Sequence, residues 1–260
     1  MLTAALDVSY RAPGISLRQT RRVAGSPECT TKCAACGLRT LCVPAGFAPE
    51  DSQAVDHIVN SRRRIRRGEH VYRAGDTFTS LYAFRTGVFK AYMESEDGRT
   101  HVTSFHMPGE LAGFDGIGTD RHTVSIVALE DGEVCVMPYG HLDGMANEVP
   151  DFQHHMHRWM SEEIVREQSQ MLLLGTMRAE ARLASFLLNL AQRFGARGYS
   201  TSEYNLRMTR EEIGSFLGLK LETVSRLFSR FQELGFLQVQ GRAIKLLDHA
   251  ALREMAGQRA

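Results

Sequence analysis

Residues 208–246, MTREEIGSFLGLKLETVSRLFSRFQELGFLQVQGRAIKL, restrict the possible fold more than any other part of this chain. Thr209 with Glu212 three positions later forms a capping-box pattern, which predicts that a helix begins there. Gly218 is expected to end that helix. Apolar residues recur at helical spacing over 221–233, so a second helix is expected there. Two short helices joined by a glycine turn are typical of a helix-turn-helix.

The two faces of the second predicted helix differ in chemistry. Its inward positions are apolar: Val224, Leu227, Phe228 and Phe231. Its outward positions near the start are polar: Glu222, Ser225, Arg226 and Ser229. The next segment, GFLQVQGRAIKL, is expected to form a hairpin around Gly241, which is the wing of a winged-helix domain. The basic residues of this region are Lys220, Arg226, Arg230, Arg242 and Lys245, in a chain of net charge +1. We therefore expect double-stranded DNA as a partner.

Residues 61–139 follow a different pattern. Short segments rich in β-branched and aromatic residues, such as SLYAFRTGVFKAYM and TVSIVALE, alternate with turn signals. This pattern predicts an antiparallel β-roll or jelly-roll barrel, and hence an α+β chain with the sheet part first. Because such barrels serve many functions, the barrel by itself does not define what the protein does.

Between the barrel and the helix-turn-helix, the sequence predicts one long helix within residues 149–176. Its seam residues recur at alternating steps of three and four: His157, Met160, Ile164, Glu167, Met171 and Leu174. Such a seam favours pairing with a second copy, although packing on the chain's own barrel is the alternative. In a symmetric parallel dimer the two Glu167 carboxylates face each other and repel, so we expect a weak homodimer that a signal can switch.

Four of the five cysteines lie in CTTKCAACGLRTLC, residues 29–42, and the fifth is Cys135. The chain has no long apolar run and no secretory pattern at its start, so we expect a cytoplasmic protein that does not enter a membrane. In that compartment clustered thiols favour metal or redox chemistry over disulfides. The spacing Cys33-x2-Cys36-x5-Cys42 suits zinc and an iron–sulfur cluster equally well. Cys135 by itself is expected to be a core residue, since EVCVMP is typical of a buried strand.

A barrel, a long helix and a winged helix in this order resemble the CRP/FNR superfamily of bacterial transcription regulators. The thiol spacing with a lone barrel cysteine resembles the oxygen-sensing FNR branch, as do FHMPGELAGFDGIG and ETVSRLFSRF. The resemblance implies a [4Fe-4S] cluster with four ligands, which match Cys33, Cys36, Cys42 and Cys135. It leaves Cys29 spare. It also implies that the cluster-loaded chain dimerises and binds an inverted-repeat site, and that oxygen converts or destroys the cluster.

The resemblance carries three further expectations. The residues that match the family's base-reading positions are Glu222, Ser225 and Arg226. The loop Glu94–Arg99 matches the position of a contact with RNA polymerase. The dimer interface matches Met160, Ile164, Glu167, Met171 and Leu174. The division that follows is a flexible tail over 1–28, a cluster segment with its barrel over 29–148, the dimer helix over 149–176 and the DNA-binding domain over 177–260.

Two other function classes compete with this interpretation. A zinc-containing or cyclic-nucleotide-responsive regulator would share the barrel, and Gly109-Glu110-Leu111 resembles part of a phosphate-binding turn. However, the required arginine–hydroxyl pair is interrupted in Arg121-His122-Thr123. An enzyme or electron carrier is the second alternative, but the sequence contains no catalytic triad motif, nucleotide-binding glycine loop or second cluster motif. We therefore do not expect an enzyme.

Overall fold

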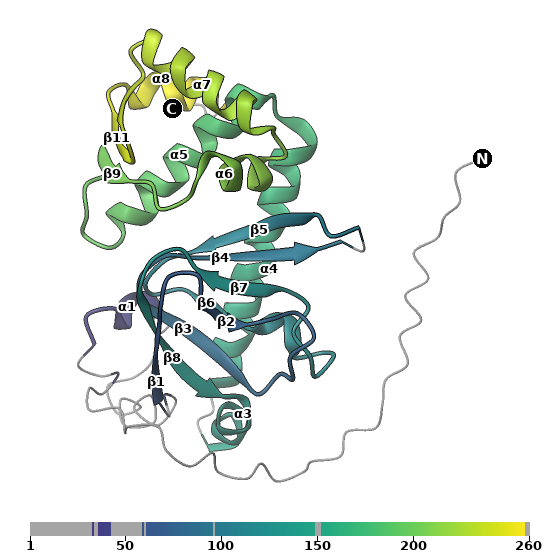
Figure 1. The fold of residues 1–260 in the computed structure, drawn as a ribbon. Coiled ribbons are helices and arrows are strands. Elements are labelled where there is room, and N and C mark those ends of the chain that lie inside the picture. Colours follow the sequence, from purple (N-terminus) through teal and green to yellow (C-terminus); the bar gives the residue numbers. More distant parts are fainter. Residues whose placement is uncertain are drawn as a thin grey trace.

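The computed structural model describes residues 33, 36–42, 59, 61–95, 97–148 and 152–257, and every structural statement below refers to these residues. The predicted tail over 1–28 and Cys29 lie outside them. The chain forms a β barrel, a long helix beside it and a smaller domain above it (Figure 1). No helix within these ranges is long and apolar enough to cross a membrane.

The barrel consists of two four-stranded antiparallel sheets, which confirms the predicted roll. One sheet has the order β1-β8-β3-β6 and the other the order β2-β7-β4-β5. The strands are β1 (Ser61–Ile65), β2 (His70–Tyr72), β3 (Ser80–Thr86), β4 (Phe89–Glu94), β5 (Thr100–His106), β6 (Leu111–Ala112), β7 (Ser125–Ala128) and β8 (Gly132–Pro138). A 3-10 turn, η3 (Phe114–Gly116), follows β6. Side chains from both sheets, including Ile65, Phe84, Phe89 and Ile126, form one apolar core.

Two helices follow the barrel, α3 (Tyr139–Glu148) and α4 (Phe152–Thr176). The first turns of α4 pack on the barrel, where Phe152, Met156 and Trp159 are buried. The remainder of α4 leaves large apolar side chains in solvent, since Ile164 is 53% exposed and Met171 is 71% exposed. The predicted long helix therefore forms, and its beginning is the part that packs most closely on its own barrel.

The C-terminal domain is a winged helix-turn-helix, as predicted. Its elements are α5 (Ala179–Gly195), β9 (Glu203–Asn205), α6 (Arg210–Leu217), α7 (Leu221–Glu233), β10 (Leu237–Gln240), β11 (Ala243–Leu246) and α8 (His249–Met255). The capping box forms, because the Thr209 hydroxyl accepts from the Glu212 N–H at 3.1 Å and the Glu212 carboxylate accepts from the Thr209 N–H at 2.8 Å. Gly218 ends α6 with φ of +63°, in the left-handed region that favours glycine.

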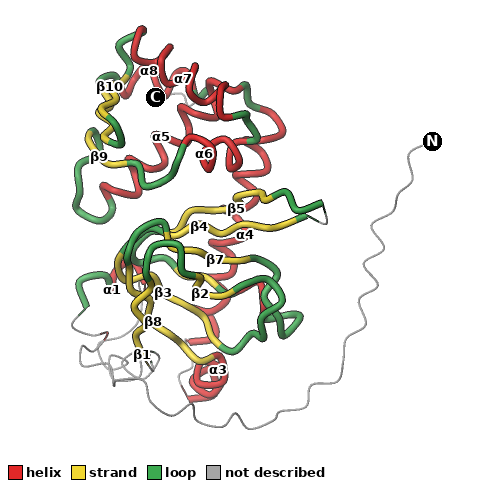
Figure 2. Tube along the Cα trace, in the orientation of Figure 1, coloured by secondary structure: helices red, strands yellow, loops and turns green. Residues whose placement is uncertain are grey.

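The barrel and the C-terminal domain share a continuous apolar core. Val102 and Phe105 of the barrel pack in one cluster with Phe186 and Leu217 of the C-terminal domain. The tube in Figure 2 shows α6 lying along β5, and the Ser215 hydroxyl accepts from the Val102 N–H at 2.9 Å at this contact. The position of the DNA-binding domain is therefore fixed by packing on the barrel as well as by the connection from α4.

Candidate functional site

Four thiols line one cavity between the short helix α1 (Arg39–Cys42) and the β1-β8-β3-β6 sheet. They belong to Cys33, Cys36, Cys42 and Cys135. Cys135 lies in the middle of β8, opposite Arg62 on β1 and Ala83 on β3. The small side chain of Ala83 leaves space beside the thiol, and that space opens into the cavity. The structure thus brings together all four residues predicted from the spacing and the resemblance.

Local hydrogen bonds shape the segment that carries three of these thiols. The Cys36 N–H donates to the Cys33 carbonyl at 3.1 Å, and the Cys42 N–H donates to the Leu38 carbonyl at 3.0 Å. These bonds close two successive turns, so sulfurs that are spaced three and six residues apart reach the same cavity. No side chain of α1 is fully buried. In the described part of the segment, Cys33 and Cys42 pack against the barrel core without being fully buried.

The thiols lie in surroundings of low polarity. Burial raises the pKa of the Cys42 thiol to about 12, and the neighbouring thiols Cys135, Cys36 and Cys33 add to this effect. Cys42 in an empty cavity is therefore protonated at neutral pH. A metal centre reverses this balance, because its positive charge stabilises thiolate ligands directly. The donor set, four thiols around an apolar cavity, suits a thiolate-bound metal group.

Trp159 connects the thiol cavity to the long helix. Its side chain lines the cavity together with the four thiols, and it lies within the buried first turns of α4. The residue that follows it, Met160, is the first apolar member of the predicted dimer seam after His157. Trp159 thus places the helix that carries the predicted seam in contact with the thiol cavity.

The exposed face of α7 holds the predicted DNA-binding residues. Val224, Leu227, Phe228 and Phe231 are buried, as predicted, and this fixes the rotation of the helix. Glu222, Ser225 and Arg226 are exposed near its start. The Arg210 guanidinium lies 3.3 Å from the centroid of the Phe228 ring, which joins α6 to α7. The helix therefore presents one polar surface of fixed shape.

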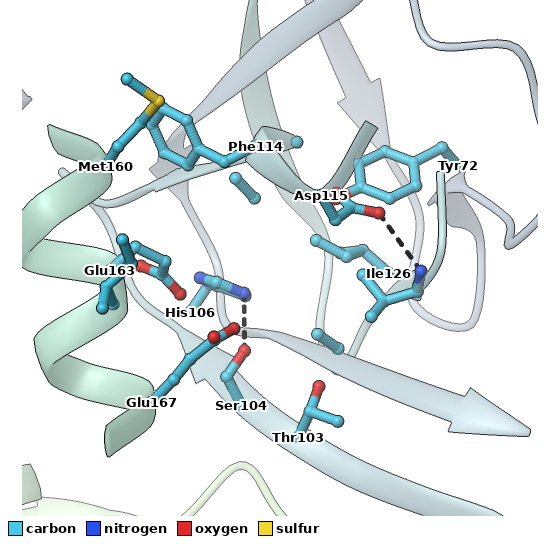
Figure 3. Close-up of a pocket in the computed structure, with 15 residues that line it drawn as sticks. Tyr72, Thr103, Ser104, His106, Phe114, Asp115, Ile126, Met160, Glu163 and Glu167 are labelled. Atoms are coloured by element: carbon cyan, nitrogen blue, oxygen red, sulfur yellow. Dashed lines mark hydrogen bonds between the residues drawn. The ribbon is translucent and has the colours of Figure 1, made fainter. Parts of the chain in front are cut away.

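A second cavity, of about 280 Å³, lies between α4 and the β2-β7-β4-β5 sheet. Figure 3 shows Glu163 and Glu167 of α4 facing His106, whose Nε2 is 2.8 Å from the Ser104 hydroxyl. Burial raises the pKa of the Glu163 carboxyl. Asp115 adds a third carboxylate, and none of the described residues that line the cavity is a lysine or an arginine. The described lining therefore offers no cationic side chain that would bind a phosphate group.

The turn that resembles a phosphate-binding site has a different role in this structure. The Glu110 carboxylate faces the end of α5, where Arg193 of that helix and Arg197 of the turn after it each bind it at 2.7 Å. Glu110 does not line the cavity beside α4. Arg121 is exposed and donates to the Gly75 carbonyl at 2.7 Å. Glu110, which belongs to the turn that suggested nucleotide binding, is thus directed away from the cavity, and Arg121, whose pairing with a hydroxyl neighbour is interrupted in the sequence, does not line it.

The fold and the site define the class of protein. A barrel, a long helix with an exposed seam and a winged helix are the parts of a transcription regulator that carries its sensor and its DNA-binding domain in the same chain. Residues 181–255 match the Crp-like helix-turn-helix domain, and residues 62–148 match the cyclic nucleotide-binding domain. The chain is 43% identical over 232 residues to the anaerobic regulatory protein of Aggregatibacter actinomycetemcomitans, which covers 89% of this chain and 90% of the relative.

Two further comparisons agree with this class. The fumarate and nitrate reduction regulatory protein of Vibrio cholerae is 42% identical over 232 residues, which covers 89% of this chain and 93% of the relative. The structure of FixK2 from Bradyrhizobium japonicum superposes with a TM-score of 0.71 at 28% identity, over 77% of this chain and 98% of the other. This chain belongs to the CRP/FNR family of transcription regulators.

Proposed function

We propose that this protein is an oxygen-responsive regulator of anaerobic metabolism whose Cys33, Cys36, Cys42 and Cys135 hold a [4Fe-4S] cluster. The observation that carries this proposal is the single cavity that these four thiols line. Relatives named for anaerobic regulation and for fumarate and nitrate reduction support the oxygen response. The DNA that such a regulator binds lies in the bacterial cytoplasm, where we propose that it acts.

The thiols by themselves suit either a single zinc ion or an iron–sulfur cluster, because both groups take four thiolate ligands. The relatives named for anaerobic regulation and for fumarate and nitrate reduction favour the cluster, since an oxygen response needs a group that reacts with oxygen and zinc has no redox chemistry.

We propose the following division of roles along the chain. When bound, a [4Fe-4S] cluster supplies an oxygen-labile link between four thiolates. Cys33, Cys36 and Cys42 then fasten residues 29–42 to Cys135 on the barrel, within the sensor part of the chain over 29–148. Residues 149–176 form the dimer helix, and residues 177–260 bind DNA. Loss of the link frees the segment and leaves the thiol cavity open beside Trp159.

The dimer interface in this proposal is the exposed seam of α4. The side chains of Ile164 and Met171 are exposed and would be covered by the helix of a second copy, whereas Met160 and Leu174 are half-buried. Glu167 lines the cavity beside α4 but is exposed, so a partner helix on the seam would bring two such carboxylates near each other. The bound cluster would hold α4 through Trp159 in the position that pairs, and this would offset the repulsion.

The proposed contacts outside the chain are double-stranded DNA and RNA polymerase. Glu222, Ser225 and Arg226 would contact base edges of an inverted repeat, since an arginine fork pairs with guanine and a carboxylate accepts from cytosine. The loop Glu94–Arg99 would contact the polymerase. Of this loop, Ser95 and residues 97–99 are exposed, and Asp97 pairs with Arg99 at 2.7 Å. Gly98 has φ of +77°, so Arg99→Ala tests this contact with less backbone strain than a change at Gly98.

The decisive experiment is the iron, acid-labile sulfide and zinc content of protein purified without air. We expect about four iron and four sulfide per chain. Cys29→Ala should keep that content, because Cys29 is outside the proposed ligand set, whereas Cys135→Ala should lose it. About one zinc per chain with no sulfide would overturn the cluster and leave a regulator with a structural metal site.

A further inference from the structure

The turn 107–110, which joins β5 to β6, is in contact with the thiol-bearing segment. Gly109 has φ of +89°, and its N–H donates to the Phe84 carbonyl at 2.7 Å. The Leu41 Cβ lies 2.5 Å from the place that a Cβ on Gly109 would occupy. Leu41 therefore packs directly on the backbone of the turn, one residue before the proposed ligand Cys42.

The opposite side of the same turn holds the end of α5. Arg193 binds the Glu110 carboxylate with two donors, Nε at 3.0 Å and Nη2 at 2.7 Å, and Arg197 Nη2 binds it at 2.7 Å. The two arginines also donate to backbone carbonyls, Arg193 to Phe105 and Arg197 to Pro108, each at 2.6 Å. These bonds attach the end of α5 to both the side chain and the backbone of the turn.

These ion pairs lie largely out of water. The Glu110 side chain is 11% exposed and the Arg197 side chain is 5% exposed. Charge-assisted hydrogen bonds of this kind are strong and directional, and removing one partner leaves a buried charge without compensation. A displacement of the turn without α5 would break these bonds and leave the arginine charges without their partner. The DNA-binding domain is therefore expected to move together with the turn.

We propose that Glu110, Arg193 and Arg197 are positioning residues that couple the thiol-bearing segment to the DNA-binding domain within one subunit. The signal that this relay carries rests on the proposed function. The path runs from Leu41 through the turn to α5 and does not pass through the seam of α4. In the present arrangement the start of α7 is exposed, so the relay holds the domain in an orientation that leaves its DNA-binding face open.

A second ion pair between the same two domains provides a matched control. Arg207 of the C-terminal domain binds Glu130 of the barrel at 3.0 Å. Glu130 lies outside the turn 107–110, and its pair is more exposed than that of Glu110. Glu130→Gln thus removes an interdomain charge contact without touching the proposed relay.

The test is a pair of double-mutant cycles on the full chain, purified without air. Leu41→Ala is combined with Glu110→Gln in one cycle and with Glu130→Gln in the other. The affinity for inverted-repeat DNA is measured by fluorescence anisotropy. We expect Glu110→Gln to weaken binding about tenfold or more. Adding Leu41→Ala to it should then change binding by less than about twofold, because the path is already broken. In the cycle with Glu130→Gln, the fold-changes in affinity of the two single variants should multiply to give that of the double variant.

Three controls keep the result interpretable. Sizing should show the same dimer fraction for Glu110→Gln as for the parent chain, because the relay does not involve the seam. If Glu110→Gln does not fold, Arg193→Lys takes its place, since it keeps the charge but loses the two-donor fork. The iron and sulfide content of each variant is measured in parallel.

The outcomes separate the relay from the proposed function. Two outcomes would overturn the relay. One is a double variant whose fold-change in affinity is the product of those of Leu41→Ala and Glu110→Gln, and the other is an unchanged DNA affinity in Glu110→Gln. A parent chain without iron and sulfide would overturn the proposed function instead. In that case the same cycles are measured by the rate of protease cleavage at the connection 176–179 between α4 and α5. Coupling between the two sites in that rate supports the relay, and independent effects reject it.

Discussion

At the scale of single residues, Arg226 is proposed to read a base of the DNA site. It is exposed on α7, and the buried Val224 and Leu227 on either side fix the direction in which it points. We predict that Arg226→Ala loses about 1 to 3 kcal/mol of binding free energy at one base pair of each half-site and accepts other bases there. Competition binding with single-base variants of the site measures this loss.

Arg230 supplies the contrast, because it is exposed one helical turn further along α7. If it contacts phosphate, Arg230→Ala weakens binding to all sequences about equally and lowers the slope of affinity against salt by about 1. Equal weakening of all sequences by Arg226→Ala would remove that residue from base recognition.

The acid sensitivity of the Glu110 contact is a second prediction at this scale. Burial alone would raise the pKa of Glu110, but Arg193 and Arg197 hold it at about 2, below its ordinary 4.5. A carboxylate with a lowered pKa stabilises the fold fully above pH 4.5, and this stabilisation is lost as the pH falls toward 2. The contribution at neutral pH is at most about 3 kcal/mol, from a shift of 1.36 kcal/mol per unit.

The measurement is the free energy of unfolding of the parent chain and of Glu110→Gln at several pH values. We expect a difference above pH 5 that shrinks steadily between pH 4.5 and 2. Other buried carboxylates, such as Asp115, are present in both chains and cancel in the difference. A difference that does not change with pH would mean that packing, and not charge, holds the turn to α5.

Single residues also mark the limit of what the sequence predicted. The capping box at Thr209 and the buried positions of α7 follow from local spacing, so they were predictable. The role of Glu110 was not, because Gly109-Glu110-Leu111 has the same local pattern whether its carboxylate meets a ligand or an arginine. The two arginines gave no helical signal either, because α5 ends at Gly195 and Arg197 lies in the turn that follows.

At the scale of elements, helix α6 depends on its N-terminal cap. The Thr209 hydroxyl satisfies one N–H at the helix start, and Glu212 also binds Lys90 of the barrel at 2.7 Å. We predict that Thr209→Ala costs about 1 kcal/mol of stability, which lowers the melting temperature by about 2 to 4 °C for a chain of this size. Thr209→Ser keeps the hydroxyl and should melt close to the parent. Equal losses in both variants would contradict a capping role.

The helices and strands that the sequence did not predict are short or show no periodic spacing of apolar residues. Helix α3, YGHLDGMANE, contains two glycines and no apolar stripe, so nothing in it predicts a helix. Strand β9 has three residues and gains its stability from pairing with β11. Helix α8 spans seven residues, below the length at which periodicity is informative. The long α4, in contrast, follows directly from its seam.

At the scale of the whole molecule, Glu167 is expected to set the balance between monomer and dimer. We predict that Glu167→Ala strengthens association at least about twofold by removing a like-charge contact, and that it favours the dimer even in air. Glu162→Ala is the matched control, since Glu162 pairs with Arg158 at 3.1 Å on an exposed part of the same helix. Sizing with and without air measures both. A Glu167→Ala chain that stays monomeric in air would exclude repulsion as the switch.

The assembly of the thiol site is a property of the whole molecule that spacing alone could not establish. Three thiols are close in sequence, but Cys135 joins them only through the pairing of β8 with β1 and β3. By itself Cys135 has the features of a core residue, and it is buried as expected. The resemblance to a family supplied the fourth position, and the fold brings it to the same cavity.

The cavity beside α4, through its acidic lining, bears on which small molecules this regulator can respond to. Its volume of about 280 Å³ is ample for a small metabolite, but Glu163, Glu167 and Asp115 give it an acidic lining. Its described lining offers the phosphates of nucleotides and phosphorylated sugars no lysine or arginine. We therefore expect this regulator, although it has a nucleotide-binding fold, to respond to a single stimulus and not to the concentrations of these metabolites.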